Sequence, residues 1–151
     1  MIIMARLIKS DLSISNKIAD FDVKVRDGVT IVGGNSATGK TLFFKEKQLH
    51  SQRHNDDSYI FINYGNKQEF NRIIAENPAN KIIFVDNADI IVPHDISVYR
   101  AIRNSSCQFI FFGRDITRYD KNYDNWAELK EGKAGKFKLS YVFKKTGKVW
   151  Q

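Results

Sequence analysis

The segment that most constrains the fold is a glycine-rich stretch that lies between an apolar run and a helix-forming run. Residues Gly34–Thr41 read GNSATGKT, which fits the spacing G-x-x-x-x-G-K-S/T without a mismatch. The β-branched residues at 29–32 before it predict a strand, and the residues at 41–50 after it predict a helix. A strand, a loop with this spacing and a helix in that order indicate a backbone cradle for phosphate groups.

Each residue type in the loop has a chemical reason to be there. Gly34 and Gly39 allow backbone conformations and close approaches that a Cβ would block. The amide N–H groups of such a loop point inward, Lys40 supplies a point charge for phosphates, and the Thr41 hydroxyl is a natural Mg²⁺ ligand. We therefore expect the nucleotide-binding residues to be those of the loop and the first helical turn: Gly34, Asn35, Ser36, Ala37, Thr38, Gly39, Lys40, Thr41 and Leu42.

A second signal is the apolar run IIFV at 82–85, which ends in Asp86 about 45 residues after the loop. The carboxyl ends of parallel strands gather at one edge of a sheet, where ligands bind. We therefore expect Asp86 and Thr41 to hold Mg²⁺. The run QFIFF at 108–112 ends near Arg114, which either contacts the γ-phosphate of its own or a neighbour's nucleotide or forms an ion pair with an acidic residue.

With these motifs in place, residues 4–116 resemble a P-loop NTPase, and within that superfamily the branch of ABC-type and AAA-type ATPases. The resemblance implies binding of ATP with Mg²⁺. These families usually place a Glu directly after the Mg²⁺-binding Asp as the general base, and here that position is Asn87. An amide can orient a water but cannot take its proton. Asn87, Asp89 and Arg114 are therefore the candidate catalytic residues, as contacts of the γ-phosphate or the attacking water.

The chain also lacks parts that the resemblance would lead one to expect. There is no Leu-Ser-Gly-Gly signature, no helical subdomain between Tyr59 and Lys81, and too little chain after Asp115 for the lid domain of AAA proteins. The absence of an Asn-Lys-x-Asp motif disfavours GTP. We expect a reduced P-loop protein that binds ATP better than it hydrolyses the β–γ phosphoanhydride.

The predicted fold class is α/β, a three-layer P-loop NTPase-like fold in a single domain over 1–151. Its central sheet is expected to be mostly parallel. The strands expected in it are 29–33, 59–63, 81–86 and 108–112, and helices are expected at 67–76 and 95–103.

Alternating apolar and polar residues at 18–25 and 135–143 predict antiparallel strands added to this sheet from both termini. The first would join the loop strand through a tight turn at Asp27-Gly28. We therefore divide the chain into a leading β-hairpin (1–28), a core (29–116) and a lysine-rich C-terminal β extension (117–151).

The net charge of +7 is concentrated at the C-terminal end, where residues 130–151 hold seven lysines and one acid. This end is either a surface for nucleic acid or an acidic partner, or a solvated lysine-rich hairpin that protects a sheet edge. The second interpretation is favoured, because no aromatic platform or arginine cluster accompanies the lysines.

The single cysteine, Cys107, lies in an apolar run and excludes a disulfide framework. No apolar run is long enough to cross a membrane, and the apolar segment within residues 1–10 is too short for a signal peptide. We therefore expect a cytoplasmic protein without membrane insertion.

Three functions remain open on these residues. The first is a nucleotide-dependent switch or weak ATPase, completed by a protein partner or a second copy of the chain. The second is a small-molecule or nucleotide kinase in which Arg100, Arg103, Arg114 and Arg118 clamp phosphates. The third is a nucleic-acid-binding protein that uses the lysine-rich end.

Overall fold

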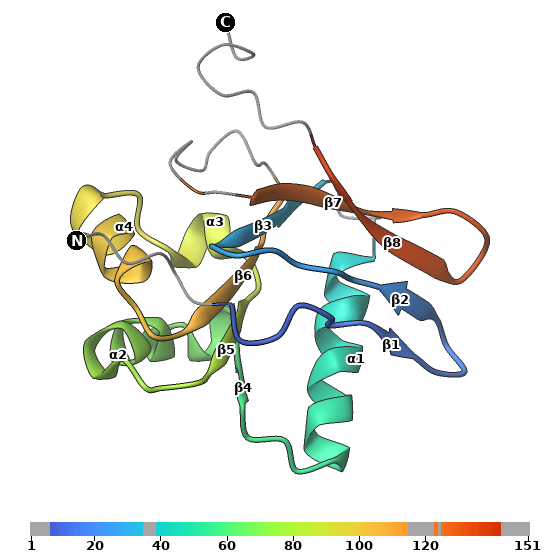
Figure 1. The fold of residues 1–151 in the computed structure, drawn as a ribbon, viewed down its shortest axis with the longest axis horizontal. Coiled ribbons are helices and arrows are strands. Elements are labelled where there is room, and N and C mark those ends of the chain that lie inside the picture. The colour runs from blue at the N-terminus through green and yellow to red at the C-terminus, as the bar shows by residue number, and fades with distance from the viewer. Residues whose placement is uncertain (1–6, 35–38, 115–122, 124, 143–151) are drawn as a thin grey trace, which may run out of the picture.

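The computed structural model describes residues 7–34, 39–114, 123 and 125–142. Eight strands form one sheet in the order β1-β2-β8-β7-β3-β6-β5-β4 (Figure 1). The strands are β1 (Ile14–Ser15), β2 (Asp20–Asp22), β3 (Thr30–Gly33), β4 (Tyr59–Ile62), β5 (Ile82–Val85), β6 (Gln108–Phe112), β7 (Asn125–Glu131) and β8 (Lys136–Tyr141). The helices are α1 (Lys40–Arg53), α2 (Gln68–Glu76), α3 (Ala88–Ile91) and α4 (Ile96–Arg103), with a 3₁₀ turn, η2 (Tyr64–Asn66).

Four strands form a parallel block around β3, with β6 beside it, then β5 and β4. Every residue of β3, β5 and β6 is buried, as expected for strands covered on both faces. Alternate side chains serve two separate cores. Phe84 and Phe112 pack with Phe43 of α1 on one face, whereas Val85 and Phe111 pack with residues of α2 on the other. The four strands predicted from apolar runs are therefore present.

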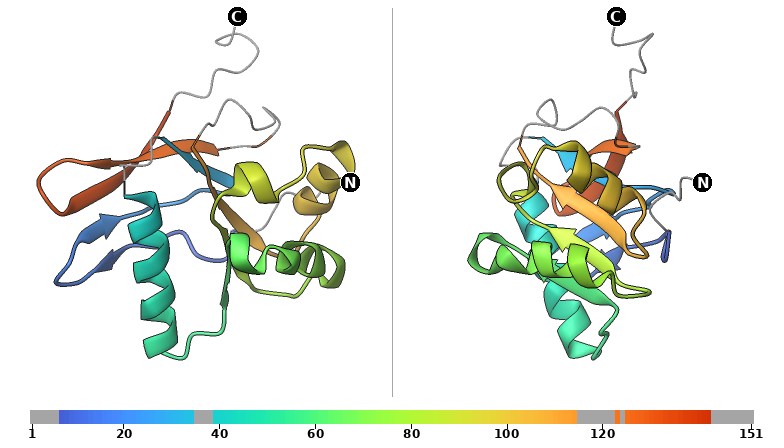
Figure 2. Two further views of the ribbon diagram at one scale, coloured as in Figure 1. Left: turned by 180° about the vertical axis from the view of Figure 1, so that it is seen from behind. Right: turned by 90° about the vertical axis from the view of Figure 1, so that its left-hand side faces the viewer.

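The predicted fold class is wrong. The described residues form a curled, mixed sheet of eight strands with few helices, instead of the predicted three-layer P-loop-like fold (Figures 1 and 2). On one face α1 stands alone, while α2, α3 and α4 gather on the other. All four added strands lie on the β7 side of β3, so the sheet grows in one direction and curls around α1.

Contacts between aromatic side chains stabilise the curl of the sheet. Phe21 of β2 stacks on Phe137 of β8, with ring centroids 4.9 Å apart, and also contacts Phe43 of α1 at 5.1 Å. Phe43 continues the cluster to Phe84 in the parallel block. Burial of these rings favours closing the added strands over α1 instead of extending the sheet flat.

The strand pairing near the termini also differs from the prediction. Residues around 18–25 do not pair with the loop strand: β2 pairs antiparallel with β1 and parallel with β8. The sequence at 119–129 indicates a polar segment anchored by Trp126 and no strand. Its residues 125–129 belong to strand β7, which lies parallel to β3. The alternation in β8 is confirmed, because Phe137 and Leu139 are buried and Lys136 and Lys138 are exposed. The predicted strands at 4–8 and 148–150 fall mostly or wholly outside the described residues.

Helix ends follow local signals. Asp95 stands directly before the helical pattern and is a candidate cap by residue type. It does cap α4, because its side chain accepts a hydrogen bond from the Val98 N–H at 2.9 Å. Ile96, which shares one face of the predicted helix with Ile102, is 54% exposed, whereas Ile102 is fully buried.

Cys107 is buried and donates its S–H to the Pro78 carbonyl. Among the described helices, none combines the length and apolar composition needed to cross a membrane.

Gln108 connects the N-terminal segment to the sheet. Its buried Oε1 accepts hydrogen bonds from the N–H groups of Ile8 and Lys9, both at 2.8 Å, and its Nε2 donates to the Lys9 carbonyl. Gln108→Leu is expected to lower the free energy of unfolding by about 2 kcal/mol, because it leaves these backbone groups without partners. Urea denaturation measures this loss. The exposed Gln68→Leu serves as control, and an equal loss there would contradict the assignment.

Candidate phosphate-binding site

The two glycines that flank the loop have the backbone conformation that the sequence pattern calls for. Gly34 and Gly39 have φ values of 113° and 91°, which side chains disfavour. Between these glycines, the predicted binding residues at 35–38 lie outside the described residues. The Lys40 ammonium donates a 2.6 Å hydrogen bond to the Gly34 carbonyl, so the lysine folds back toward the start of the loop. The two ends of the loop are therefore tied together by the lysine that was predicted to bind phosphate.

The N-terminal end of helix α1 is favourable for binding an anion. It begins at Lys40, with no acidic residue in its first turn, and the cap residue Gly39 offers no side chain. The first N–H groups of a helix lack partners within the helix and carry the positive end of its dipole. Thr41 in this turn is exposed, so its hydroxyl is open to a ligand. Leu42 is half-buried and packs against the core on the α1 side of the sheet.

Charges from several elements act on Lys40. Burial lowers the pKa of its ammonium, and Asp86, Asp89 and Glu128 oppose this effect. Arg114, which follows β6, lowers the pKa of Lys40 further. Burial likewise raises the pKa of Asp86, and Lys40 opposes that rise. The ends of β5 and β6 thus bring Asp86 and Arg114 into electrostatic reach of the loop lysine, as the sequence predicted.

The residues after β5 adopt a tight turn. Asn87 has a φ of 51°, is exposed, and donates its backbone N–H to Asp86 Oδ1 at 3.0 Å. Asp89 lies half-buried in the first turn of α3. Asp86 and the Thr41 hydroxyl are hard oxygen donors of the kind that Mg²⁺ prefers, and these two would hold the ion beside bound phosphates. Within the described residues no cluster of three or more His, Cys, Asp or Glu side chains forms a metal site by itself.

Two further residues reach the site from the C-terminal strands, and the sequence analysis missed both. Glu128 of β7 pairs with Gly33 at the end of β3, one residue before Gly34. Phe137 of β8 lies directly against Gly39, where a Cβ would come within 2.6 Å of its ring. No local sequence signal marks either residue, because both contacts depend on β7 lying beside β3.

The lysines of the β7–β8 hairpin have acidic neighbours. Lys136 lies 4.0 Å from Asp20, and Lys130 lies 3.7 Å from Glu128. Lys138 pairs in register with Asp22, which lowers the local positive charge. These pairs favour the interpretation of this hairpin as a solvated, charge-balanced surface. The predicted protection of a sheet edge is wrong, because β8 lies between β2 and β7, and β7 lies between β8 and β3. Lys144, Lys145 and Lys148 lie outside the described residues.

The arginines expected for a phosphate clamp do not converge. Arg100 and Arg103 are in the last turn of α4, shortly before β6 begins. Because β6 is parallel to β3, its start lies at the sheet edge opposite the loop. Arg118 falls outside the described residues. Of the four arginines proposed for a kinase, only Arg114 is placed near Lys40.

The class of site that these observations define is a strand-to-helix turn with a buried lysine, an uncapped helix start and a carboxylate from a neighbouring strand end. No protein-family model matches the chain, and no curated protein sequence matches it either.

Proposed function

We propose that the chain binds Mg²⁺–ATP at the turn between β3 and α1 and acts as a nucleotide-dependent switch with weak or partner-stimulated hydrolysis. The observation that carries this proposal is Lys40. It is 93% buried, since only 7% of its surface is exposed, and it bonds the Gly34 carbonyl at the uncapped start of a 14-residue helix. A buried ammonium beside the first N–H groups of a helix, which have no partners within the helix itself, fits a phosphate ligand.

The side chains around Lys40 support nucleotide binding with slow hydrolysis. Asp86 and Thr41 would hold Mg²⁺, and Arg114 would contact the terminal phosphate. Asn87 can orient a water, whereas proton removal would need a carboxylate such as Asp89. A switch therefore suits the residues better than fast turnover, and a partner or a second copy would supply what the site lacks.

Thermal unfolding with and without Mg²⁺–ATP tests the proposal. At about 100 times Kd, ATP is expected to raise the free energy of unfolding by about 2.7 kcal/mol, which shifts Tm by several degrees. Lys40→Ala is expected to abolish the shift, whereas the exposed Lys67→Ala keeps it. The absence of a shift with ATP, ADP and GTP alike would contradict nucleotide binding.

A Mg²⁺ titration separates metal from nucleotide. Asp86→Asn is expected to keep the fold, because it removes a carboxylate whose pKa burial raises, and to lose the Mg²⁺-dependent part of the ATP shift. Release of inorganic phosphate on the same samples then distinguishes a switch from an enzyme. Rapid turnover by the isolated wild type, abolished by Asp86→Asn, would overturn the switch and support an ATPase.

A further inference from the structure

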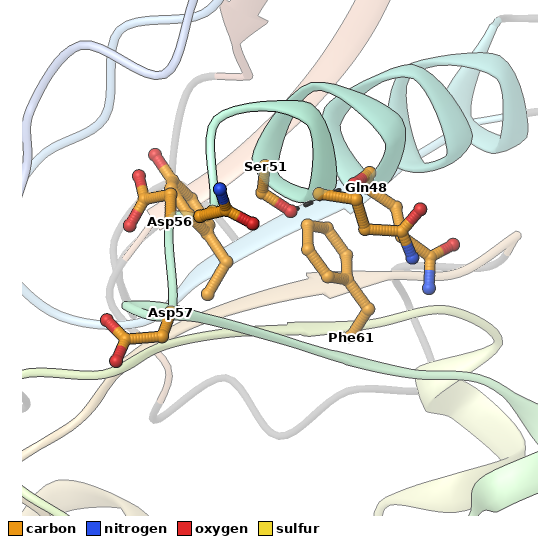
Figure 3. A pocket seen from close by; sticks show the side chains of 8 residues that line it. Gln48, Ser51, Asp56, Asp57 and Phe61 are labelled. Carbon is orange, nitrogen blue, oxygen red and sulfur yellow. Dashed lines mark hydrogen bonds between the residues drawn. The ribbon is translucent and has the colours of Figure 1, made fainter.

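A groove lies at the opposite end of α1 from the phosphate-binding loop, between this helix and β4. Its volume is about 530 Å³. Figure 3 shows Ser51 and Gln48 descending from α1, Phe61 rising toward them from β4, and Asp56 and Asp57 at one end. Amide, hydroxyl, carboxylate and aromatic side chains line the groove. They belong to Gln48, Ser51, Gln52, Asn55, Asp56, Asp57, Tyr59 and Phe61.

The groove adjoins a free sheet edge, because β4 is the last strand of the sheet. The carbonyls of Ser58 and Ile62 bond to β5, so Tyr59 and Phe61 turn their backbone groups away from it. The Asn66 side-chain amide donates a hydrogen bond to the Phe61 carbonyl at 3.0 Å. Among the described residues, none bonds to the N–H of Tyr59 or of Phe61. These two donors lie on the edge, beside the groove that their side chains line.

The protection of this edge against strand pairing is limited to its short length of four residues and to the Asn66 side chain on the Phe61 carbonyl. Natural edge strands carry lysines, prolines or bulges that prevent another chain from adding to the sheet. The sequence of β4 is YIFI, four apolar or aromatic residues. A strand of this composition is suited to pairing with an added backbone.

A buried hydroxyl in the groove wall lacks a partner. Tyr59 is only 8% exposed, and its Oη has no hydrogen bond among the described residues. Such a group costs free energy unless something accepts its proton. Tyr59→Phe is therefore expected to stabilise the protein.

The charges on the groove have one sign. Asp56 and Asp57 are the charged lining residues, and within the part of the chain that the structure describes neither forms an ion pair. Hydrogen bonds from Ser58 lower the pKa of Asp56, which keeps it ionised. Lys81 contacts the Asp57 main-chain carbonyl, so it leaves that carboxylate available. Lys9 and Lys47, which do not line the groove, also lower the pKa of Asp56 and offset part of its charge. In a protein of net charge +7, the acidic lining of this groove favours a basic ligand.

We propose that this groove binds an extended peptide segment carrying lysine or arginine, which adds to the free edge of β4 as a further strand. Its backbone pairs with the N–H groups of Tyr59 and Phe61. Its basic side chains reach Asp56 and Asp57 between α1 and β4. Strand addition beside a helix-lined groove gives affinity through main-chain bonds and specificity through side chains. The proposal is independent of nucleotide binding.

The test uses the full chain and a fluorescein-labelled peptide of about eight residues that alternates lysine and valine. Fluorescence anisotropy is expected to show saturable binding, and NMR to show shifts of the Tyr59 and Phe61 amides. The double variant Asp56→Asn, Asp57→Asn is expected to weaken binding about tenfold. Tyr59→Phe is expected to raise Tm of the free protein, because it removes the unpaired hydroxyl, and to leave peptide binding unchanged.

Two control peptides isolate the two parts of the interaction. A glutamate-for-lysine peptide tests charge, and a peptide N-methylated at alternate residues tests backbone pairing; neither is expected to bind. Circular dichroism establishes that each variant is folded. The proposal is overturned if the glutamate peptide binds equally, if the aspartate variants bind as the wild type does, or if the Tyr59 and Phe61 amides do not shift. Self-association through β4 that the peptide cannot displace would assign the edge to a second copy instead.

Discussion

Lys47→Met is expected to stabilise the protein at neutral pH by about 2 kcal/mol. Lys47 is only 3% exposed, and its ammonium lies over the Tyr59 ring, 4.9 Å from the centroid. Burial, the largest cause, and the neighbouring Lys9 lower the pKa of Lys47 from 10.5 to about 8. That shift corresponds to about 3 kcal/mol of destabilisation at neutral pH. Methionine removes this cost and gives up a cation–π contact of about 1 kcal/mol.

The lowered pKa of Lys47 also determines how the free energy of unfolding changes with pH. Below pH 8 both the folded and the unfolded chain carry the proton, so the cost of burying the charge is constant. Between pH 8 and 10.5 the unfolded chain binds the proton and the folded chain does not, so wild-type stability rises with pH. Burial raises the pKa of Tyr59 to about 12, and this reverses the trend above pH 10.

Urea denaturation from pH 7 to 10 measures this rise in wild type, Lys47→Met and Lys45→Met. Lys45 lies on the same helix and is exposed, so it is the matched control, with an expected change within about 0.5 kcal/mol. The rise should be reduced in Lys47→Met, where the lowered pKa of Lys40 still contributes, and intact in Lys45→Met. A rise of equal size in both variants would show that Lys47 does not cause it.

Gly39→Ala is expected to lower the free energy of unfolding by about 3 kcal/mol. The φ of 91° at Gly39 disfavours any side chain, and an added Cβ would lie 2.6 Å from the Phe137 ring. That ring is buried and stacked on Phe21, so it cannot move away freely. Strain and overpacking at one position add to give a large effect.

A double-mutant cycle with Phe137→Leu tests the steric part. The smaller side chain makes room for the alanine methyl, so the double variant should lose less stability than the two single losses combined. The control is Gly132→Ala, where an added Cβ meets nothing within 4 Å, and its stability should stay within about 0.5 kcal/mol of wild type. Strict additivity in the cycle would show that Phe137 does not crowd Gly39.

Local patterns predicted the parts of the fold that depend on neighbours in sequence. The apolar runs located β3 to β6, and the spacing of the loop placed positive φ values at Gly34 and Gly39. The Asp95 cap followed from its position before a helical pattern. These features depend on a few adjacent residues, because strand burial, turn conformation and helix capping are local preferences.

Pairings between distant segments were not predictable in the same way. The sequence predicted added strands at both termini but not on one side of β3, and it predicted no strand at 125–131. An alternating pattern specifies a buried face without specifying the neighbouring strand. The fold class was therefore wrong although most strands were right.

For the candidate site, the sequence by itself determined the glycines, Lys40 and the acid at the end of β5, because their types and spacing carry the chemistry. Only the tertiary structure decided that Glu128 and Phe137 join the loop and that α1 and the free edge of β4 enclose a groove. The physical reason is that these contacts arise from parallel pairing of β7 with β3 and from the curl of the sheet around α1. Both result from packing between segments far apart in the chain, for which no local pattern exists.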